Sequence, residues 1–315
     1  MIKKICRLLC ISIFLFSAVS CYGSWNFWYE GNDVDVRTKE LLNINESNDQ
    51  KFVDSGLAEL GGKYTVLIIS DTHFGNTKKE LDTEKLFTWL DSIQGTADYP
   101  VFAINLGDVT DLGRRDHFEQ YTEFCKTLTK KYNMKIIFNV CGNHDAYQNN
   151  WENWMRDCYP HTSFYRFQTK KFSWYCLDTA SGTVGIKQYY LLHSALENDS
   201  RQKIVFTHYP FVRFTFDCAN MAETTERNLL LSDFAKNNVK CVLGGHNHEK
   251  SYDDLGFPDY GLPSFAYDNE WGLLHVNEDT GEVTLDFVGE KDKKKLIEPD
   301  THISPQPVID PKFSE

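Results

Sequence analysis

Residues 64–73 read YTVLIISDTH, an apolar and β-branched run that ends on Asp71 and His73. Such a run is typical of a strand buried on both faces, as in the parallel sheets of α/β proteins. Polar side chains that follow the strand directly lie at its carboxyl end, where open α/β sheets bind their ligands. The stretch therefore predicts a central strand and one corner of a functional site.

The same arrangement recurs along the chain. Further apolar runs end on polar residues over residues 101–106, 135–140, 204–207 and 240–243. Apolar residues recur at helical spacing over residues 81–93, 118–128, 187–197 and 228–236. Other strands are predicted over residues 171–177, 264–267, 272–277 and 283–288, with a turn at 279–281. Strands that alternate with helices predict an α/β domain.

Composition and charge narrow the class of protein. The chain has 315 residues, of which 41% are apolar and 25% charged, so it can bury a substantial core. Its formal net charge of −12 argues against a nucleic acid duplex as the main partner. Duplex binding rests on clustered Lys and Arg that neutralise phosphates.

The N-terminus is typical of an exported protein. Lys3, Lys4 and Arg7 precede an apolar run over residues 8–19, which has signal-peptide length and is short for a membrane span. Small residues before Cys21 resemble a bacterial lipobox, although Ala18 stands where Leu is usual. We expect a signal peptide over residues 1–21, a lipid on Cys21 that attaches the protein to a membrane, and a periplasmic or cell-surface location. Ordinary secretion and a retained anchor are the alternatives.

The rest of the chain divides into three parts. Residues 22–60 are polar and without clear periodicity, and they predict a tether with one short helix. Residues 61–290 form the predicted domain. Residues 291–315, with a Lys cluster and several prolines, predict a loosely ordered tail.

Three cysteines coincide with the predicted strands, and two others lie in predicted loops. Cys141, Cys176 and Cys241 lie in or beside apolar runs, where we expect buried free thiols. An exported protein can form disulfides. Cys158 and Cys218, both in loop-like sequence, are the pair best suited to one.

Five polar motifs stand at the predicted strand ends: Asp71-Thr72-His73, Gly107-Asp108, Gly142-Asn143-His144-Asp145, His208 and Gly245-His246-Asn247-His248. Carboxylate, imidazole and amide donors suit divalent transition metals such as Mn, Fe or Zn. Two metals close together need a bridging group, and a carboxylate can bridge. Asp108, a lone acid on a Gly-flanked turn, is the natural candidate.

The order D-x-H, G-D, G-N-H-D, H, G-H-x-H closely resembles the calcineurin-like metallophosphoesterase superfamily, over about residues 64–288. Within it, the chain is most similar to the bacterial phosphodiesterase-like branch. The resemblance implies a four-layered α/β/β/α sandwich with two central mixed sheets. It also implies a dinuclear metal site at the C-terminal ends of the strands.

The resemblance further implies a role for each motif residue. The first metal would be held by Asp71, His73 and His248, the second by Asn143, His208 and His246, with Asp108 bridging both. A metal-activated hydroxide would then attack phosphorus. His144 would contact the phosphate and protonate the leaving oxygen, and Asp145 would orient His144.

One departure bears on the metals. Purple acid phosphatases carry a tyrosine three residues after the bridging acid, and Asp111 stands there in this chain. We therefore expect no tyrosine-bound iron, and we expect Asp111 to be a helix cap or a supporting acceptor for the segment that begins at Arg114. The predicted function is hydrolysis of a small phosphomonoester or phosphodiester. A membrane-surface lipid phosphoesterase and a non-catalytic binding or scaffold protein with the same fold are the alternatives.

Overall fold

The computed structural model of the chain describes residues 34–78, 81–147, 150–212, 221 and 224–289. The predicted signal peptide with Cys21, the predicted disulfide partner Cys218 and the predicted tail 291–315 lie outside this part. Among the described residues, none of the helices combines the length and the apolar character needed to cross a membrane.

Three parallel strands and a hairpin make up a five-stranded sheet. Its strands are β12 (Glu282–Gly289), β11 (Glu270–Asn277), β2 (Lys63–Ile69), β3 (Phe102–Asn105) and β4 (Ile137–Asn139), in this spatial order. The three strands β2, β3 and β4 run parallel, and β11 pairs antiparallel with β2 and β12. All five were predicted from their apolar runs.

The second sheet has seven strands. In spatial order they are β1 (Leu42–Asn43), β5 (Tyr165–Gln168), β6 (Phe172–Cys176), β7 (Gln202–Phe206), β8 (Val239–Gly244), β10 (Pro258–Gly261) and β9 (Ser251–Asp254). Here too the central strands β6, β7 and β8 are parallel. The strands β1, β5, β9 and β10 were not predicted, because each is short and mixes polar with apolar residues.

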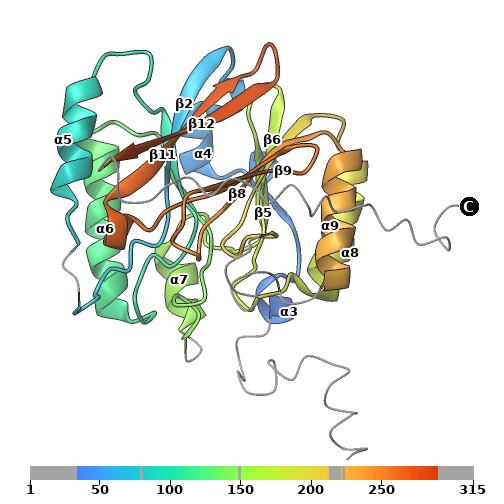
Figure 1. Cartoon of the computed structure of the whole chain (residues 1–315), viewed down its shortest axis with the longest axis horizontal. Coiled ribbons are helices and arrows are strands. Elements are labelled where there is room, and N and C mark those ends of the chain that lie inside the picture. The colour runs from blue at the N-terminus through green and yellow to red at the C-terminus, as the bar shows by residue number, and fades with distance from the viewer. Residues whose placement is uncertain (1–33, 79–80, 148–149, 213–220, 222–223, 290–315) are drawn as a thin grey trace, which may run out of the picture.

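Helices cover the outer face of each sheet, as Figure 1 shows. On the five-stranded side lie α5 (Glu84–Ile93), α6 (Arg115–Lys130) and α7 (Trp151–Asp157), and on the seven-stranded side α8 (Gly185–Glu197), α9 (Thr224–Lys236) and α3 (Val34–Arg37). One apolar cluster fills the space between the sheets, where the rings of Phe138 and Phe167 stack with centroids 4.0 Å apart. Two further clusters lie under the helices. The predicted α/β/β/α sandwich with two mixed sheets is confirmed.

The tether predicted over residues 22–60 is wrong for its described part. Residues 34–60 pack on the domain through α3, β1, α4 (Gln50–Ser55) and two short 3₁₀ turns, and β1 pairs with β5. Ile44, Phe52 and Leu57 are buried in the core between the sheets. Their irregular spacing among polar residues gave no periodic signal, although their burial accounts for the packing.

The strand predicted over residues 264–267 is also wrong. This segment forms a helical turn, α10 (Phe265–Asp268). The Ser264 hydroxyl accepts a hydrogen bond from the Tyr267 N–H, and Asn269 ends the turn in the left-handed conformation. Both are ordinary helix-terminus signals.

The predicted cysteine environments are confirmed in the described part. Cys141, Cys176 and Cys241 are free and fully buried, and burial raises the pKa of each thiol well above its usual range. Thiols in such surroundings are unreactive.

Candidate metal centre

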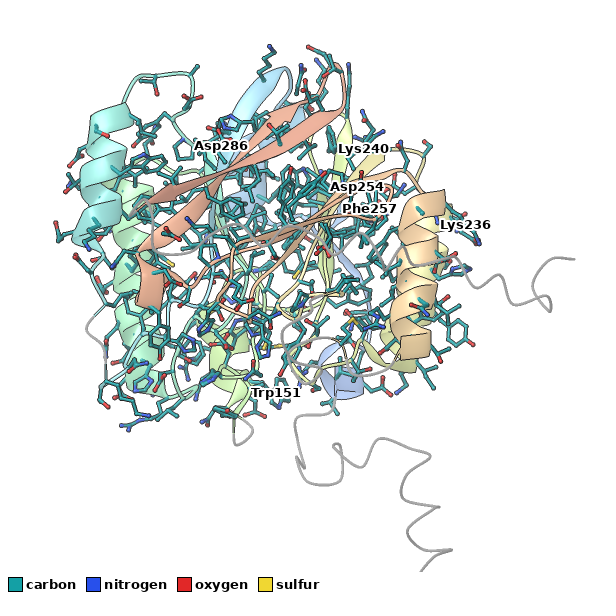
Figure 2. All side chains as sticks on the ribbon, viewed as in Figure 1. Trp151, Lys236, Lys240, Asp254, Phe257 and Asp286 are labelled. Carbon is teal, nitrogen blue, oxygen red and sulfur yellow. The ribbon has the colours of Figure 1, made fainter. Side chains whose placement is uncertain are left out.

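The predicted ligands lie at one edge of the sandwich, where both sheets end. Asp71, Asp108 and Asn143 follow β2, β3 and β4, while His208 and His246 follow β7 and β8. In Figure 2, Lys240, near the start of β8, lies on the opposite side of the domain from Trp151 of α7. The end of β8 that carries His246 therefore lies toward the side of Trp151. The two sheets meet at this edge, because Nδ1 of His208 donates to the Leu106 carbonyl oxygen at 2.9 Å.

Five of the predicted ligands have an unusual backbone. Asp71, His73, Asp108, His246 and His248 all have positive φ angles, between 44° and 67°. This left-handed region is disfavoured for residues other than glycine, at a cost of order 1 kcal/mol or more each. Strain concentrated on one set of polar residues indicates a functional site.

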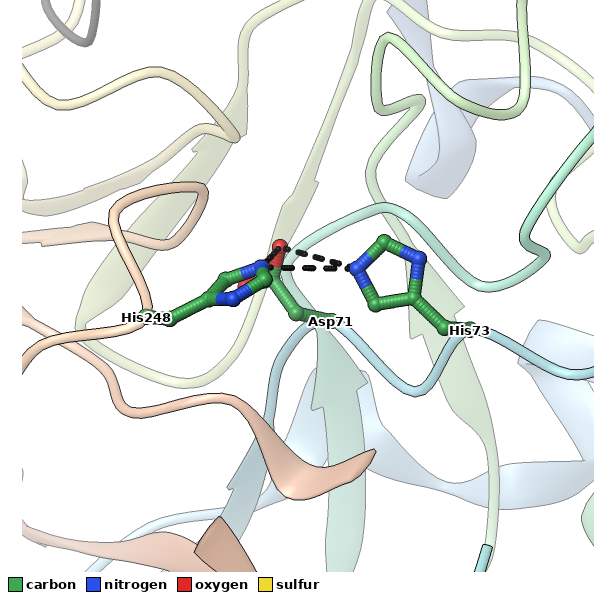
Figure 3. A group of neighbouring side chains, drawn as sticks. All are labelled: Asp71, His73 and His248. Atoms are coloured by element: carbon green, nitrogen blue, oxygen red, sulfur yellow. Dashed lines mark hydrogen bonds and ion pairs between the residues drawn. The ribbon is translucent and has the colours of Figure 1, made fainter. Parts of the chain in front are cut away.

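The first group of converging side chains is Asp71, His73 and His248, drawn in Figure 3. Nε2 of His73 lies 3.4 Å from Nε2 of His248. Oδ1 of Asp71 lies 3.2 Å from Nε2 of His248 and 4.0 Å from Nε2 of His73. Two ligands of a tetrahedral ion, each about 2.1 Å from it, are about 3.4 Å apart, so the spacing suits one shared ion.

The second group gathers around Asp108. Its members Asp108, His208 and His246 bring ligand atoms within 4.8 Å of one another. Nε2 of His208 lies 3.3 Å from Oδ2 of Asp108 and 3.0 Å from Oδ1 of Asn143. Asp108 also belongs to a third group with His73 and His144, so it lies between the two halves of the site, where a bridging carboxylate must lie.

The charges of the site are strongly coupled. Burial alone would raise the pKa of Asp71 and of Asp108, but the neighbouring His248 and His208 hold both pKa values well below their usual range. Burial lowers the pKa of His208, yet the Asp108 carboxylate outweighs it and raises that pKa to about 9. Burial and the neighbouring His208 lower the pKa of His246 to about 4. The aspartates are thus held as carboxylates.

Two glycines of the motifs are required by close approach. A Cβ on Gly142 would lie 2.2 Å from the backbone nitrogen and from Oδ1 of Asp108. A Cβ on Gly245 would lie 2.1 Å from the Ser70 hydroxyl oxygen. At both positions the backbone of one ligand loop touches a residue of another ligand loop, so only glycine fits.

His144 lies beside the first group without entering it. Its ring meets the ring of His73 edge-on, with centroids 4.8 Å apart. Nδ1 of His144 lies 2.7 Å from the backbone carbonyl oxygen of Asp111. A carbonyl only accepts, so Nδ1 carries the proton of the neutral ring and Nε2 is left as the atom that can take up or give a proton.

The role predicted for Asp145 is wrong, because its carboxylate does not contact His144. Oδ1 accepts from the N–H and hydroxyl of Thr110, and Oδ2 accepts from the N–H groups of Val109 and Gly142. Burial and the nearby Asp108 carboxylate raise the pKa of Asp145 to about 7. Asp145 therefore joins the loops after β3 and β4 and fixes Asp108 only indirectly. The carbonyl of Asp111 is the group that orients His144.

Asp111 lies behind His73, one of the proposed ligands. Its carboxylate oxygen lies 3.5 Å from Nδ1 of His73 and accepts from the Asn76 amide at 3.2 Å. It does not cap a helix, because α6 begins after Arg114. Nδ1 of His73 has no hydrogen-bond partner among the described residues, so the carboxylate faces this ring as a charge.

Two tyrosines in the site were not predicted. Tyr209 stacks on His246 with centroids 3.8 Å apart, and Tyr267 stacks on His248 at 5.2 Å. The Tyr267 hydroxyl accepts from the Asn76 amide at 2.7 Å. Tyr209 could have been suspected because it follows His208 directly, whereas Tyr267 was hidden by the wrong strand prediction.

A separate groove of about 920 Å³ lies between α5 and the ends of β11 and β12. It is lined by Trp89, Trp271 and Phe287 among others, and by none of the predicted ligands. Its acids do not converge with histidines, so its size does not make it the site of the chemistry.

The arrangement of acids, amide and histidines at the joint edge of two sheets has a counterpart among known families. The model of the calcineurin-like phosphoesterase family matches residues 64–250. The chain belongs to this family. Its chemistry is therefore phosphoester hydrolysis, and the matched segment includes every predicted ligand.

Comparisons outside the family model are more distant. An archaeal phosphodiesterase of known structure is 12% identical, with a TM-score of 0.36, over 71% of this chain and 99% of that one. A cold-active protein-tyrosine phosphatase from a psychrophilic Shewanella is 13% identical, with a TM-score of 0.37, over 74% of this chain and 84% of that one. No curated protein sequence matches the chain.

The side chains fit the metal ions that a metallophosphoesterase implies. Nδ1 of His208 donates to the Leu106 carbonyl, so Nε2 is the ring atom left to bind either a proton or a metal ion. It faces two oxygen acceptors, on Asn143 and Asp108, at 3.0 and 3.3 Å. Oxygen acceptors that converge in this way need a positive charge among them. Without a metal the proton on His208 supplies it, as its raised pKa indicates, and a bound metal ion would take the place of that proton.

Proposed function

We propose that the chain hydrolyses a small phosphomonoester or phosphodiester with a dinuclear metal centre. The proposed ligands are Asp71, His73 and His248 for one ion, Asn143, His208 and His246 for the other, and Asp108 between them. The observation that carries the proposal is the convergence of the acids and histidines into two groups, one with Asp71, His73 and His248 and one with Asp108, His208 and His246, which a third group containing His73 and Asp108 links. The donors suit Mn, Fe or Zn.

The chain's own residues have separate tasks in this reaction. Held by these residues, metal ions would supply a nucleophile by lowering the pKa of water and would offset charge on the phosphoryl oxygens. The Asp108 carboxylate is held between the two groups by the His144 backbone N–H, which donates to Oδ1 at 2.8 Å. Nε2 of His144 is the proposed donor of a proton to the leaving oxygen, because Nδ1 is held by the Asp111 carbonyl.

We further propose that the enzyme is exported and attached to a membrane by a lipid on Cys21, at the periplasmic or cell-surface side. The basic start, the apolar run over residues 8–19 and the small residues before Cys21 support this location. Mass spectrometry of the mature protein tests it, since a lipid would add its mass to an N-terminal Cys21.

The experiment for the activity combines metal analysis with one substitution. The purified chain, loaded with Mn²⁺, should bind two ions and hydrolyse bis(p-nitrophenyl) phosphate or p-nitrophenyl phosphate. Asp108→Ala should lose at least about 10³-fold in kcat, because the shared ligand is gone. Asp98→Ala, which removes a carboxylate that is 62% exposed, is the matched control and should leave kcat unchanged.

Full activity in Asp108→Ala would contradict the mechanism. Two bound ions without turnover of either ester would instead favour the non-catalytic scaffold alternative. Turnover of both esters by the unsubstituted chain would leave the relative kcat/KM values to decide between monoester and diester preference.

A further inference from the structure

Four apolar side chains are exposed on the first turns of α8 and on α3, two helices that pack on each other. They are Val36, Ile186, Tyr190 and Leu191, whose exposed fractions are 42%, 62%, 65% and 38%. Ile186 and Tyr190 are four residues apart and share one side of the helix. The exposed Lys187 lies among them on the first turns of α8, and toward the C-terminal end of this helix the exposed positions are polar, with Ser194 and Glu197. We call the four apolar residues the α3–α8 patch.

The patch is at the same edge of the domain as the metal centre. The helix α8 follows β6, whose carboxyl end lies beside the carboxyl end of β7 in the parallel pair. The connecting loop reaches the site, because Thr179 accepts from the Tyr209 N–H at 2.8 Å. A Cβ on Gly182 would lie 3.9 Å from the Tyr209 ring, which itself stacks on His246.

The helix α3 is fixed to this loop by buried contacts. Arg37 donates from Nε and Nη2 to the Asp178 carboxylate at 2.7 and 2.9 Å, and both side chains are fully buried. Nζ of Lys187 lies 3.9 Å from Asp35, which joins α3 to α8. Figure 1 shows α3 at the lower ends of α8 and α9. The patch therefore belongs to the packed domain.

The chain enters the described domain at this patch. Only twelve residues, 22–33, separate Cys21 from Val34, and they can span at most about 40 Å. Trp25, Phe27, Trp28 and Tyr29 lie within this stretch, and aromatic residues of this kind are enriched at membrane interfaces. Of all the described helices, α3 is thus the one that the fewest residues separate from an anchor at Cys21.

We propose that the α3–α8 patch docks on the lipid surface, so that the edge of the domain carrying the metal centre faces the membrane. The inference rests on the proposed lipid attachment. Ile186, Tyr190 and Leu191 offer aliphatic and aromatic surface with one hydroxyl, a combination suited to the boundary between water and lipid.

The test uses the full chain in phosphatidylcholine vesicles with an environment-sensitive fluorophore on a single introduced cysteine. Ile186→Cys places the fluorophore in the patch, and Val53→Cys, at the same 62% exposure on α4, is the matched control. The labelled unsubstituted chain gives the background from native cysteines such as Cys125. We expect a blue shift and quenching by brominated phosphatidylcholine at position 186, and neither at position 53.

Three results would overturn the docking: failure of the chain to sediment with vesicles, a probe at 186 that stays unquenched, or equal quenching at 186 and 53. A blue shift at 186 without quenching by brominated lipid would mean that residues 25–29 of the chain cover the patch, which also contradicts the proposal. Tyr190→Glu in the Ile186→Cys chain should abolish the quenching.

The same vesicles separate this inference from the proposed function. Hydrolysis of soluble bis(p-nitrophenyl) phosphate with an unquenched probe at 186 would leave the phosphoesterase standing and remove the docking. Quenching at 186 with no hydrolysis of either ester would do the reverse.

Discussion

The two sheets contribute to the metal centre in different ways. The five-stranded sheet supplies the oxygen donors Asp71, Asp108 and Asn143, and the loops that carry them are joined by backbone hydrogen bonds. The Asp71 N–H donates to the Gly107 carbonyl and the His73 N–H donates to the Asp108 carbonyl, both at 3.0 Å. Such main-chain bonds hold the loops without depending on side-chain rotamers.

The seven-stranded sheet supplies His208, His246 and His248, and these rely on contacts with the other sheet. His208 donates to Leu106, and the His246 N–H donates to Oδ2 of Asp71 at 3.1 Å. Tyr209 stacks on the ring of His246, and Tyr267 stacks on the ring of His248. The difference teaches that the oxygen-bearing half is a template held by its own main-chain bonds, and that the histidine half packs onto it.

The strongest test of this comparison removes Asp145, which joins the loops of the oxygen-bearing half. Asp145→Ala would leave the N–H groups of Val109, Thr110 and Gly142 buried without acceptors, at about 1–3 kcal/mol each. We expect the free energy of unfolding to fall by about 5 kcal/mol, and metal binding to weaken for both ions. Urea denaturation and metal titration measure the two effects.

Asp145→Asn is the graded control. Its amide oxygen can still accept from Thr110, while its NH₂ group faces two donors, so we expect roughly half of the destabilisation. Stability unchanged in both variants would show that the loops do not depend on this carboxylate.

The next largest effect is expected in the other half, at the buried Arg37–Asp178 pair. Arg37→Ala would leave the Asp178 carboxylate buried beside Ser181 without its cation. Breaking such a pair costs about 3 kcal/mol. Because the pair supports the loop behind Tyr209 and touches no ligand, we expect lower stability with metal content still at two ions. Loss of metal in this variant would mean that the histidine half depends on the Arg37–Asp178 pair to position its metal ligands.

The features that could be predicted from the sequence are those that depend on local composition. Apolar runs that end near Asp71, Asp108 and Asn143 predicted both the strands and the ligands, because a strand buried on both faces requires a continuous apolar run. The supporting contacts could not be predicted in this way. Nothing in local composition tells that Asp145 joins two loops, or that the carbonyl of Asp111 holds His144, because those bonds depend on how separate loops align.

Two further failures have local causes. Ser264 and Asn269 carry the signals of a short helix, and the apolar character of the residues between them suggested a strand instead. Residues 34–60 pack through a few irregularly spaced apolar side chains, such as Phe52, that a periodicity argument overlooks. In both cases tertiary contacts decided what the local pattern left ambiguous.

The third prediction concerns His144, which follows β4 and lies close to His73 and Asp108 without being one of the proposed ligands. His144→Ala should lower kcat by about 10²-fold, the usual contribution of a positioned general acid, with two ions still bound. Asp111→Asn is the matched variant. Since the backbone carbonyl of Asp111 contacts Nδ1 of His144, changing its side chain should preserve most of the His144 contribution. Loss of a metal ion in His144→Ala would mean that His144 is a ligand.

The smallest expected effects separate the two stacked tyrosines of the histidine half. An aromatic stack is worth about 1 kcal/mol, or roughly five-fold in a binding constant. Tyr209 lies closer to its histidine than Tyr267 does, and His248 has the Asp71 carboxylate as a second support. Tyr209→Ala should therefore weaken one metal site by about five-fold, and Tyr267→Ala should weaken the other by less.

Calorimetric titration of Mn²⁺ into the metal-free chain resolves the two sites and measures these differences. Tyr267→Phe keeps the ring and removes the hydroxyl that binds Asn76, so it isolates the stack from the hydrogen bond. Equal weakening by Tyr209→Ala and Tyr267→Ala would show that ring distance does not set the support each histidine receives. No weakening by either would mean that the oxygen-bearing template alone positions the histidines, because their bonds to Leu106 and Asp71 then suffice.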